Sequence, residues 1–185
     1  MIVNSEEPLA TIGCLGLIQR RLEENYLAPY MLFLFEDLIS GKRIHYCTHE
    51  AWSFNYVRFG LIEDCPLYGL GKSMLKKNRS CSVILPWWLV ESQSKEQNEV
   101  VGARHEHGIG DGVSIAKESI GFRACMGIAP TPNCKDFSKL YLSNPEIFRR
   151  CFSDGITLSI REMFKKNWVS KETELKLLKG MGILH

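Results

Sequence analysis

Two pairs of short strands, each joined by a local turn, constrain the fold most strongly. The first pair is an aromatic and aliphatic run at 30–35 and an alternating apolar and polar run at 43–48, with the turn residues Ser40-Gly41-Lys42 between them. The second pair covers 112–116 and 122–129, joined across 117–121. Strands joined by tight turns pair antiparallel, so the sequence predicts an antiparallel sheet.

Helical patterns lie before, between and after these strand pairs. Leu15, Ile18 and Leu22 share one helical face within 15–25, and Trp52 and Tyr56 share another within 50–59. A third helix is predicted over 91–107, ended by Gly108, and a fourth opens at an Asn144 N-cap followed by proline and runs to about 166. Residues 81–85 read as a further strand closed by proline. The fold class predicted from this order is α+β.

Composition narrows the class of protein. The chain has 185 residues, 45% of them hydrophobic and 24% charged, which is typical of one compact domain. Its 23 Lys and Arg against 21 Asp and Glu give a net charge of +2, which is not the strong positive charge of a nucleic-acid-binding protein. The N-terminus has no signal-peptide pattern and the longest apolar run, 27–35, is about half a membrane span, so a cytoplasmic protein outside the membrane is expected.

The cysteines and histidines give no strong sign of a metal or a nucleophile. Seven cysteines without a C-x-x-C pair are typical of free thiols in a reducing compartment. His105 and His107 are two residues apart and would point in different directions on a helix, so no metal or other cofactor is predicted. Cys65 or Cys81 could meet one of these histidines and Asp64, but no local signature accompanies them, and no enzyme activity is predicted.

Aromatic residues form the most distinctive candidate site. Trp52, Tyr56, Tyr68, Trp87 and Trp88 each combine an apolar ring with a polar hydrogen atom. Such a set can line a mostly dry ligand pocket and offer a few directed donors. The same residues could instead form part of an ordinary core, and composition alone does not separate the two interpretations.

The order of these residues resembles that of a known family. Trp52-x3-Tyr56-x8-Cys65-Pro66, then Pro86-Trp87, then Ala103-x4-Gly108-x3-Gly112-Val113 and Gly121 follow one another along the chain. This pattern resembles the autoinducer-binding domain of the LuxR family of quorum-sensing regulators over roughly 15–166. The resemblance implies an α-β-α sandwich with a central antiparallel sheet of about five strands, and an N-acyl homoserine lactone bound between the sheet and one helical layer.

The resemblance also implies roles for individual residues. Trp52 would donate to the lactone carbonyl, Tyr56 would contact the amide or acyl chain, Trp87 or Trp88 would form a wall of the pocket, and Gly112 would start the strand at its floor. The expected ligand-binding residues are Trp52, Tyr56, Asp64, Cys65, Tyr68, Trp87, Trp88, Gly112, Cys125 and Gly127.

Two positions depart from the family pattern. Cys65 stands where the family has an aspartate that accepts the ligand amide, with Asp64 one residue earlier, and a thiol is a poor acceptor. Cys125 and Gly127 follow Gly121 where many relatives place a Ser or Thr. The sequence therefore predicts a pocket in which Asp64 turns inward, a pocket for a less polar ligand, or a closed pocket.

The predicted organisation is a sensor domain at 1–166 and a tail, or the start of a helix-turn-helix domain, at 167–185. The expected function is small-molecule signal sensing for transcription regulation, without DNA binding by this chain alone. The expected partners are a second copy or a related regulator. The alternative is an interaction module with a closed pocket that modulates a full-length regulator by forming a heterodimer.

Overall fold

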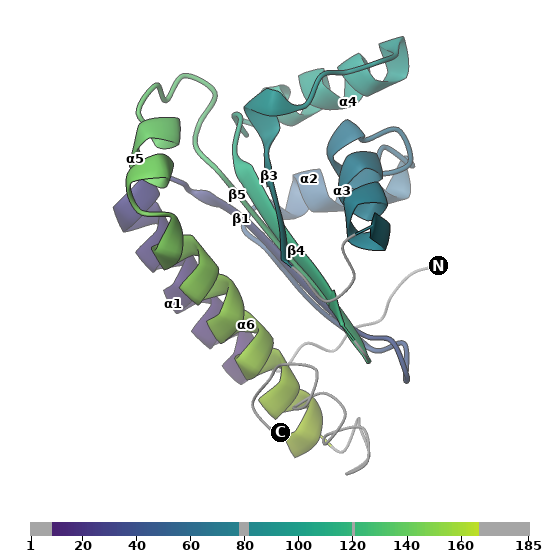
Figure 1. Ribbon diagram of the computed structural model, residues 1–185, viewed down its shortest axis with the longest axis vertical. Helices are drawn as coiled ribbons and strands as arrows, with labels where there is room; N and C mark the ends of the chain where they lie inside the picture. The colour runs from purple at the N-terminus through teal and green to yellow at the C-terminus, as the bar shows by residue number, and fades with distance from the viewer. Residues whose placement is uncertain (1–8, 78–81, 120, 167–185) are drawn as a thin grey trace.

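A computed structural model describes residues 9–77, 82–119 and 121–166 (Figure 1). Cys81 and the predicted tail or helix-turn-helix segment at 167–185 lie outside these residues. The helices are α1 (Leu9–Tyr26), α2 (Glu50–Arg58), α3 (Pro66–Lys77), α4 (Lys95–Glu106), α5 (Phe137–Ser143) and α6 (Pro145–Lys165), with a 3-10 turn, η1, at Trp87–Leu89. The strands are β1 (Tyr30–Asp37), β2 (Arg43–Cys47), β3 (Ser82–Pro86), β4 (Val113–Ser119) and β5 (Phe122–Ala129).

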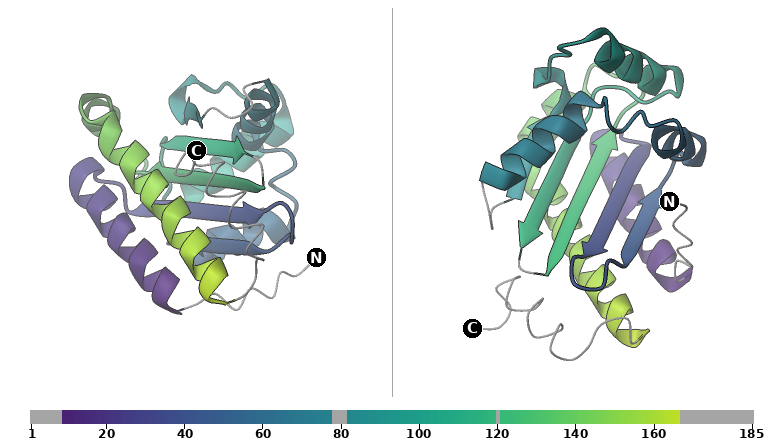
Figure 2. Two further views of the ribbon diagram at one scale, coloured as in Figure 1. Left: turned by 60° about the horizontal axis from the view of Figure 1, so that its bottom comes forward. Right: turned by 90° about the vertical axis from the view of Figure 1, so that its right-hand side faces the viewer.

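The strands form one five-stranded sheet in the order β2-β1-β5-β4-β3, and all neighbours are antiparallel. Helices α1, α5 and α6 cover one face, and α2, α3 and α4 cover the other (Figures 1 and 2). The α+β class, the α-β-α sandwich and both predicted hairpins are confirmed.

The main core lies between the sheet and α1 with α6. Alternation along β1 turns Met31, Phe33 and Phe35 to this face, where all three are fully buried. The Phe33 ring meets the Phe152 ring of α6 edge-on, with 6.5 Å between ring centroids. Burying each such side chain stabilises the fold by roughly 1.5–3 kcal/mol, so this face supplies most of the apolar stabilisation.

Local sequence explains where α4 begins and ends. The Ser94 side chain accepts a hydrogen bond from the Gln97 backbone N–H, and the helix therefore starts at Lys95 rather than at 91 as predicted. Gly108 has a φ of 74°, the left-handed conformation that ends a helix, as the sequence predicted. The turn at Gly108 leads into the loop before β4, where the Gly110 N–H donates a hydrogen bond to the Pro130 carbonyl.

Three features differ from the sequence-based expectations. Neither α3 nor the seven-residue α5 was predicted. Asn144 does precede Pro145 at the start of α6, but its side chain makes no capping hydrogen bond, so the predicted N-cap is wrong in that respect. The Asn144 carbonyl instead accepts a hydrogen bond from the hydroxyl of Tyr26 in α1, and this contact ties the two helices of the main core together.

Candidate functional site

The candidate site lies on the sheet face covered by α2, α3 and α4 (Figure 2). Strand register sets its floor, because Leu32 pairs with Gly127 and Gly127 with Ser114 across three adjacent strands. Two residues further along the strands, Cys125 pairs with Leu34 on one side and with Ala116 on the other. Leu32, Leu34 and Ala116 remain partly exposed although they lie in the middle of the sheet. The helical layer therefore covers this face less completely than α1 and α6 cover the other.

Trp52 and Tyr56 lie one turn apart on α2 and face this floor. Their ring centroids are 5.2 Å apart, and Trp52 is 5% exposed. They pack in a second core cluster with Tyr30 of β1 and Trp87 of η1. Burial raises the pKa of both Tyr30 and Tyr56 well above 10. Both hydroxyls therefore remain protonated at any physiological pH. Within the protein, the Tyr30 hydroxyl is hydrogen-bonded with Cys47 and Trp52, and the Tyr56 hydroxyl with Cys65.

Asp64 and Cys65 face opposite ways. Asp64 is exposed to solvent, whereas Cys65 is buried at 6% exposure beside Tyr56. The carboxylate that could have replaced the family's aspartate thus does not enter the site. The Cys125 thiol on the floor is uncharged, since burial raises its pKa to about 11. The arrangement favours neither thiolate chemistry nor a buried carboxylate acceptor.

Trp87 closes one end of the site. Its indole N–H donates to the Ser114 hydroxyl at 2.8 Å, and its ring meets the Tyr30 ring edge-on at 6.2 Å between centroids. A side chain at Gly127 would bring its Cβ within 3.2 Å of Cζ2 of this indole. Gly127 therefore makes room for the tryptophan, and Ser114 uses the indole donor that a ligand would otherwise receive.

Arg104 is a site residue that the sequence-based reasoning missed. Its guanidinium lies 4.7 Å from the Trp87 ring centroid, and its side chain is 7% exposed. Nη2 donates to Oδ1 of Asp111 at 2.9 Å, while buried Nε has no partner among the described residues. Burial lowers the pKa of Arg104, but the group stays charged. The site therefore contains a buried cation with an unused donor.

Trp88 and Tyr68 do not pack in this aromatic cluster, although Trp88 lines the pocket beside Trp87. The Trp88 ring packs edge-on against Phe137 and Tyr141 of α5, with centroid distances of 6.3 and 6.5 Å. Tyr68 is 41% exposed, and the Lys72 ammonium lies 5.7 Å from its ring centroid. Of the aromatic residues singled out in the sequence, the structure thus brings together Trp52, Tyr56 and Trp87.

Gly112 lies directly before β4, as expected, and close packing explains why this position is a glycine. A Cβ there would lie 1.9 Å from the Ile128 carbonyl oxygen. The Gly112 carbonyl accepts a hydrogen bond from the Trp87 backbone N–H at 2.9 Å. Glycine at this position thus lets the strand approach its neighbour and fixes the place of η1.

A pocket of about 160 Å³ opens beside Trp87 and is lined in part by Leu67, Arg104, His105 and Asp111. This volume is below the roughly 300–1,000 Å³ of most small-molecule sites. In residues 9–77, 82–119 and 121–166, no group of three or more His, Cys, Asp or Glu side chains is placed to hold a metal ion. Every helix in the same ranges is too short or too polar to cross a bilayer.

No protein-family model matches the sequence, and no curated protein sequence is significantly similar to it. Solved structures do match the fold. The crystal structure of Escherichia coli SdiA superposes with a TM-score of 0.53 at 12% identity, over 80% of this chain and 61% of that one. SdiA in complex with octanoyl-rac-glycerol superposes with a TM-score of 0.51 at 12% identity, over 80% and 59%.

A third structure is that of CepR2 from Burkholderia cenocepacia, described as an N-acylhomoserine lactone dependent LuxR family transcription factor. It gives a TM-score of 0.47 at 11% identity, over 75% of this chain and 93% of that one. The chain spans about 60% of the length of SdiA. The SdiA matches show that the chain has the LuxR-type autoinducer-binding fold.

Proposed function

We propose that this chain is a LuxR-type signal-sensing domain of a cytoplasmic transcriptional regulator, which binds a small molecule between the sheet and helices α2 to α4. The observation that carries this proposal is the convergence of Trp52, Tyr56 and Trp87 over a partly covered sheet face, in a chain with the SdiA fold. Tyr30 and Tyr56 supply neutral donors, and the aromatic rings supply apolar walls.

The chemistry of the site favours a ligand rich in hydrogen-bond acceptors. Asp64 is exposed and Asp111 is paired with Arg104, so neither carboxylate is free to accept an amide N–H from a ligand in the site. Arg104 instead offers an unused buried donor. An acyl homoserine lactone has carbonyl acceptors for these donors, and its amide N–H would be left without the usual partner, at a cost of about 1–3 kcal/mol.

Thermal unfolding with acyl homoserine lactones of varied chain length tests the proposal. A ligand at 100 times its dissociation constant adds about 2.7 kcal/mol to the free energy of unfolding, which corresponds to a rise of roughly 5–10 °C in Tm for a chain of this size. Trp52→Phe and Tyr56→Phe should reduce the rise, because each removes one donor and keeps the ring. The exposed substitution Tyr68→Phe is the matched control and should leave the rise unchanged.

The closed-pocket interaction module is a second candidate, and the packing of Trp87 over Gly127 favours it. A domain of this kind would show no ligand-dependent rise in Tm and would form a heterodimer with a full-length LuxR-type regulator. Size-exclusion chromatography with light scattering, on the chain alone and mixed with such a regulator, separates a homodimer, a heterodimer and a monomer. A monomer in both samples would contradict both dimer versions.

A further inference from the structure

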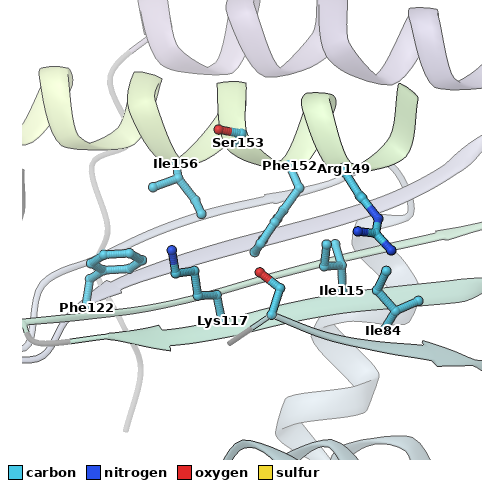
Figure 3. A pocket seen from close by; sticks show the side chains of 9 residues that line it. Ile84, Ile115, Lys117, Phe122, Arg149, Phe152, Ser153 and Ile156 are labelled. Atoms are coloured by element: carbon cyan, nitrogen blue, oxygen red, sulfur yellow. The ribbon is translucent and has the colours of Figure 1, made fainter. Parts of the chain in front are cut away.

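A pocket of about 200 Å³ lies between α6 and the β3 side of the sheet, on the face opposite the candidate site (Figure 3). Its walls include the apolar side chains of Ile115, Phe122, Phe152 and Ile156, each 5% exposed or less. A cavity of about 150 Å³ accommodates benzene. The pocket therefore has room for one large apolar side chain.

The outer edge of β3 lies beside this pocket. In the sheet that the described residues form, β3 is the last strand and pairs only with β4. An edge strand presents unpaired backbone N–H and C=O groups, which can bind an extended segment of another chain. Ser82, which is exposed, and Ile84, which is partly exposed, line the pocket from this strand. A strand added at this edge would thus lie next to the pocket.

Two cations line the pocket at separate points. The Lys117 side chain lies on the Phe122 side and the Arg149 side chain on the Ile84 side, with Phe152 between them (Figure 3). Lys117 comes from β4 and Arg149 from α6. The apolar part of the pocket therefore lies between two positive charges.

Neither cation has a strong carboxylate partner. Among residues 9–77, 82–119 and 121–166, no carboxylate lies within 4.0 Å of the Lys117 ammonium, and none of the lining residues is acidic. Nε of Arg149 is 3.6 Å from Oε1 of Glu146, whose side chain is 80% exposed. Such an exposed pair contributes little. Both charges are therefore available to acidic groups of a partner.

We propose that this pocket and the β3 edge bind an extended acidic segment of a partner protein, which adds as a strand beside β3 and inserts one large apolar side chain into the pocket. Side chains at alternate positions of a strand share a face and lie about 6.6 Å apart. Acidic residues two positions before and two positions after the apolar residue are thus roughly 13 Å apart, one on each side of it. This pattern matches an apolar pocket with one cation on each side.

A second copy of this chain matches the edge less well. Its own β3 would bring Ser82–Pro86 to the edge, and this segment contains no acidic residue. Lys117 and Arg149 would then remain without carboxylate partners. Charge complementarity therefore favours an acidic segment of a different protein. The aromatic cluster of the candidate site packs on the other face of the sheet, so this proposal does not depend on signal binding.

Fluorescence anisotropy with labelled heptapeptides tests the proposal at fixed ionic strength. The probe Thr-Glu-Thr-Phe-Thr-Glu-Thr has the proposed pattern, and its symmetric sequence lets it pair with β3 in either direction. Replacing both glutamates by glutamine should weaken binding by at least about tenfold, because the neutral peptide loses two charge-assisted contacts. Replacing the phenylalanine by alanine should weaken binding by about tenfold or more, because the pocket is then left unfilled.

Variants of the two cations locate the charged contacts. Lys117→Met and Arg149→Gln should each weaken binding of the glutamate peptide by about fivefold or more and leave binding of the glutamine peptide unchanged. Arg149→Glu should reverse the preference, so that a peptide with one glutamate replaced by lysine binds more tightly than the glutamate peptide. Arg150→Gln is the matched control, since Arg150 is exposed, follows Arg149 on α6 and does not line the pocket.

A variant that fills the pocket tests the apolar contact separately. Ser153 is exposed on α6 and lines the pocket, so Ser153→Trp should place an indole in the opening without disturbing the core and should abolish peptide binding. Amide NMR shifts on addition of the peptide should be largest in β3, β4 and α6. The indole N–H signals of Trp52 and Trp87 should not move.

Several results would overturn the proposal. They are absence of peptide binding, equal binding of the glutamate and glutamine peptides, an equal loss in Arg150→Gln, and NMR shifts confined to the Trp52 and Trp87 indoles. Peptide binding that weakens as the chain concentration rises would overturn it in favour of a second copy on the β3 edge. Should Lys117→Met fail to fold, the variants at the exposed positions Arg149 and Ser153 decide the outcome.

Discussion

At the residue scale, Gly112 occupies a place where two strands leave no room for a side chain. Its Cβ would lie 1.9 Å from the Ile128 carbonyl oxygen and 2.7 Å from the Ala129 Cβ. Gly112→Ala should lower the free energy of unfolding by about 3 kcal/mol or more, because backbone atoms must move. Urea unfolding followed by circular dichroism measures this change.

Gly102 provides the matched control for that substitution. It lies inside α4, and a Cβ there meets no atom within 4 Å. Gly102→Ala should raise the free energy of unfolding by about 0.5–1 kcal/mol, since alanine loses less backbone freedom on folding. Equal effects of the two substitutions would contradict the packing described around Gly112.

The buried guanidinium of Arg104 leads to a second prediction at this scale. Asp111→Asn should cost about 1–2 kcal/mol, because it leaves a buried cation without its carboxylate, which is itself half exposed. Arg104→Met should cost less than Asp111→Asn, because it removes the charge and fills the same space. The double variant should recover most of the loss in a double-mutant cycle. A larger cost for Arg104→Met would show that the charge itself stabilises the fold.

The two kinds of site residue differ in how far the sequence could predict them. Trp52 and Tyr56 lie one helical turn apart, so the spacing alone predicted that their rings meet. The burial of Arg104 depends on Trp87, which is distant in sequence, and on the loop that carries Asp111. In the sequence, Arg104 stands beside His105 and close to His107, a pattern that suggests a metal site rather than a buried cation. Non-local packing of this kind leaves no periodic signal in a single sequence.

At the scale of elements, the Ser94 cap decides where α4 begins. Ser94→Ala should lower the free energy of unfolding by about 0.5–2 kcal/mol, because the Gln97 N–H loses its acceptor. Ser94→Asp should retain the stability, since aspartate caps equally well. Ser143→Ala is a control, because that hydroxyl bonds only the carbonyl one turn earlier in α5. Urea unfolding of the three variants checks this; a neutral Ser94→Ala would contradict the capping role.

Elements with strong local signals were predicted from the sequence, and those without were missed. Each of the two hairpins has turn residues between two strands. The helix α6 has a long apolar stripe that packs in the main core. The helix α3 contains Gly69 and Gly71, which lower helix propensity by about 1 kcal/mol each relative to alanine. The helix α5 has seven residues, too few for a clear period.

At the scale of the whole molecule, two partly buried histidines should make stability depend on pH. Burial lowers the pKa of His45, and burial together with His107 lowers the pKa of His49. The unfolded chain then binds protons near pH 6.5 while the folded chain does not. Stability should therefore be greatest above about pH 6.5 and fall as the pH decreases toward the lower pKa of the folded state.

His45→Gln checks this assignment. Thermal unfolding at pH 7.5 and pH 5.0 should show a smaller loss of Tm on acidification in the variant than in the wild type. His45 lies on β2, and its ring contacts the Ser53 hydroxyl of α2 at 3.3 Å. Glutamine can keep a hydrogen bond there without a proton that titrates in this range. An unchanged loss of Tm would assign the pH dependence to other groups.

The order of the strands in the sheet could not be predicted from local patterns either. Each hairpin follows from its own turn, but nothing in either turn shows that β1 lies beside β5 at the centre of the sheet. The LuxR resemblance supplied the layers and the approximate strand number, and the structure confirms both. The site depends on this central pairing, because Leu32 and Gly127 form its floor together.

The pairing of β1 with β5 has a consequence for synthesis of the chain. Asp37 of β1 pairs with Phe122 of β5, so the central pair of the sheet cannot form until the chain as far as β5 has left the ribosome. At ~5–20 residues per second the first hairpin waits on the order of ten seconds with one edge open. Loop closure over such a distance also slows refolding. The nascent chain is thus exposed to aggregation or chaperone binding during that interval, and slower translation through 40–120 would lengthen it.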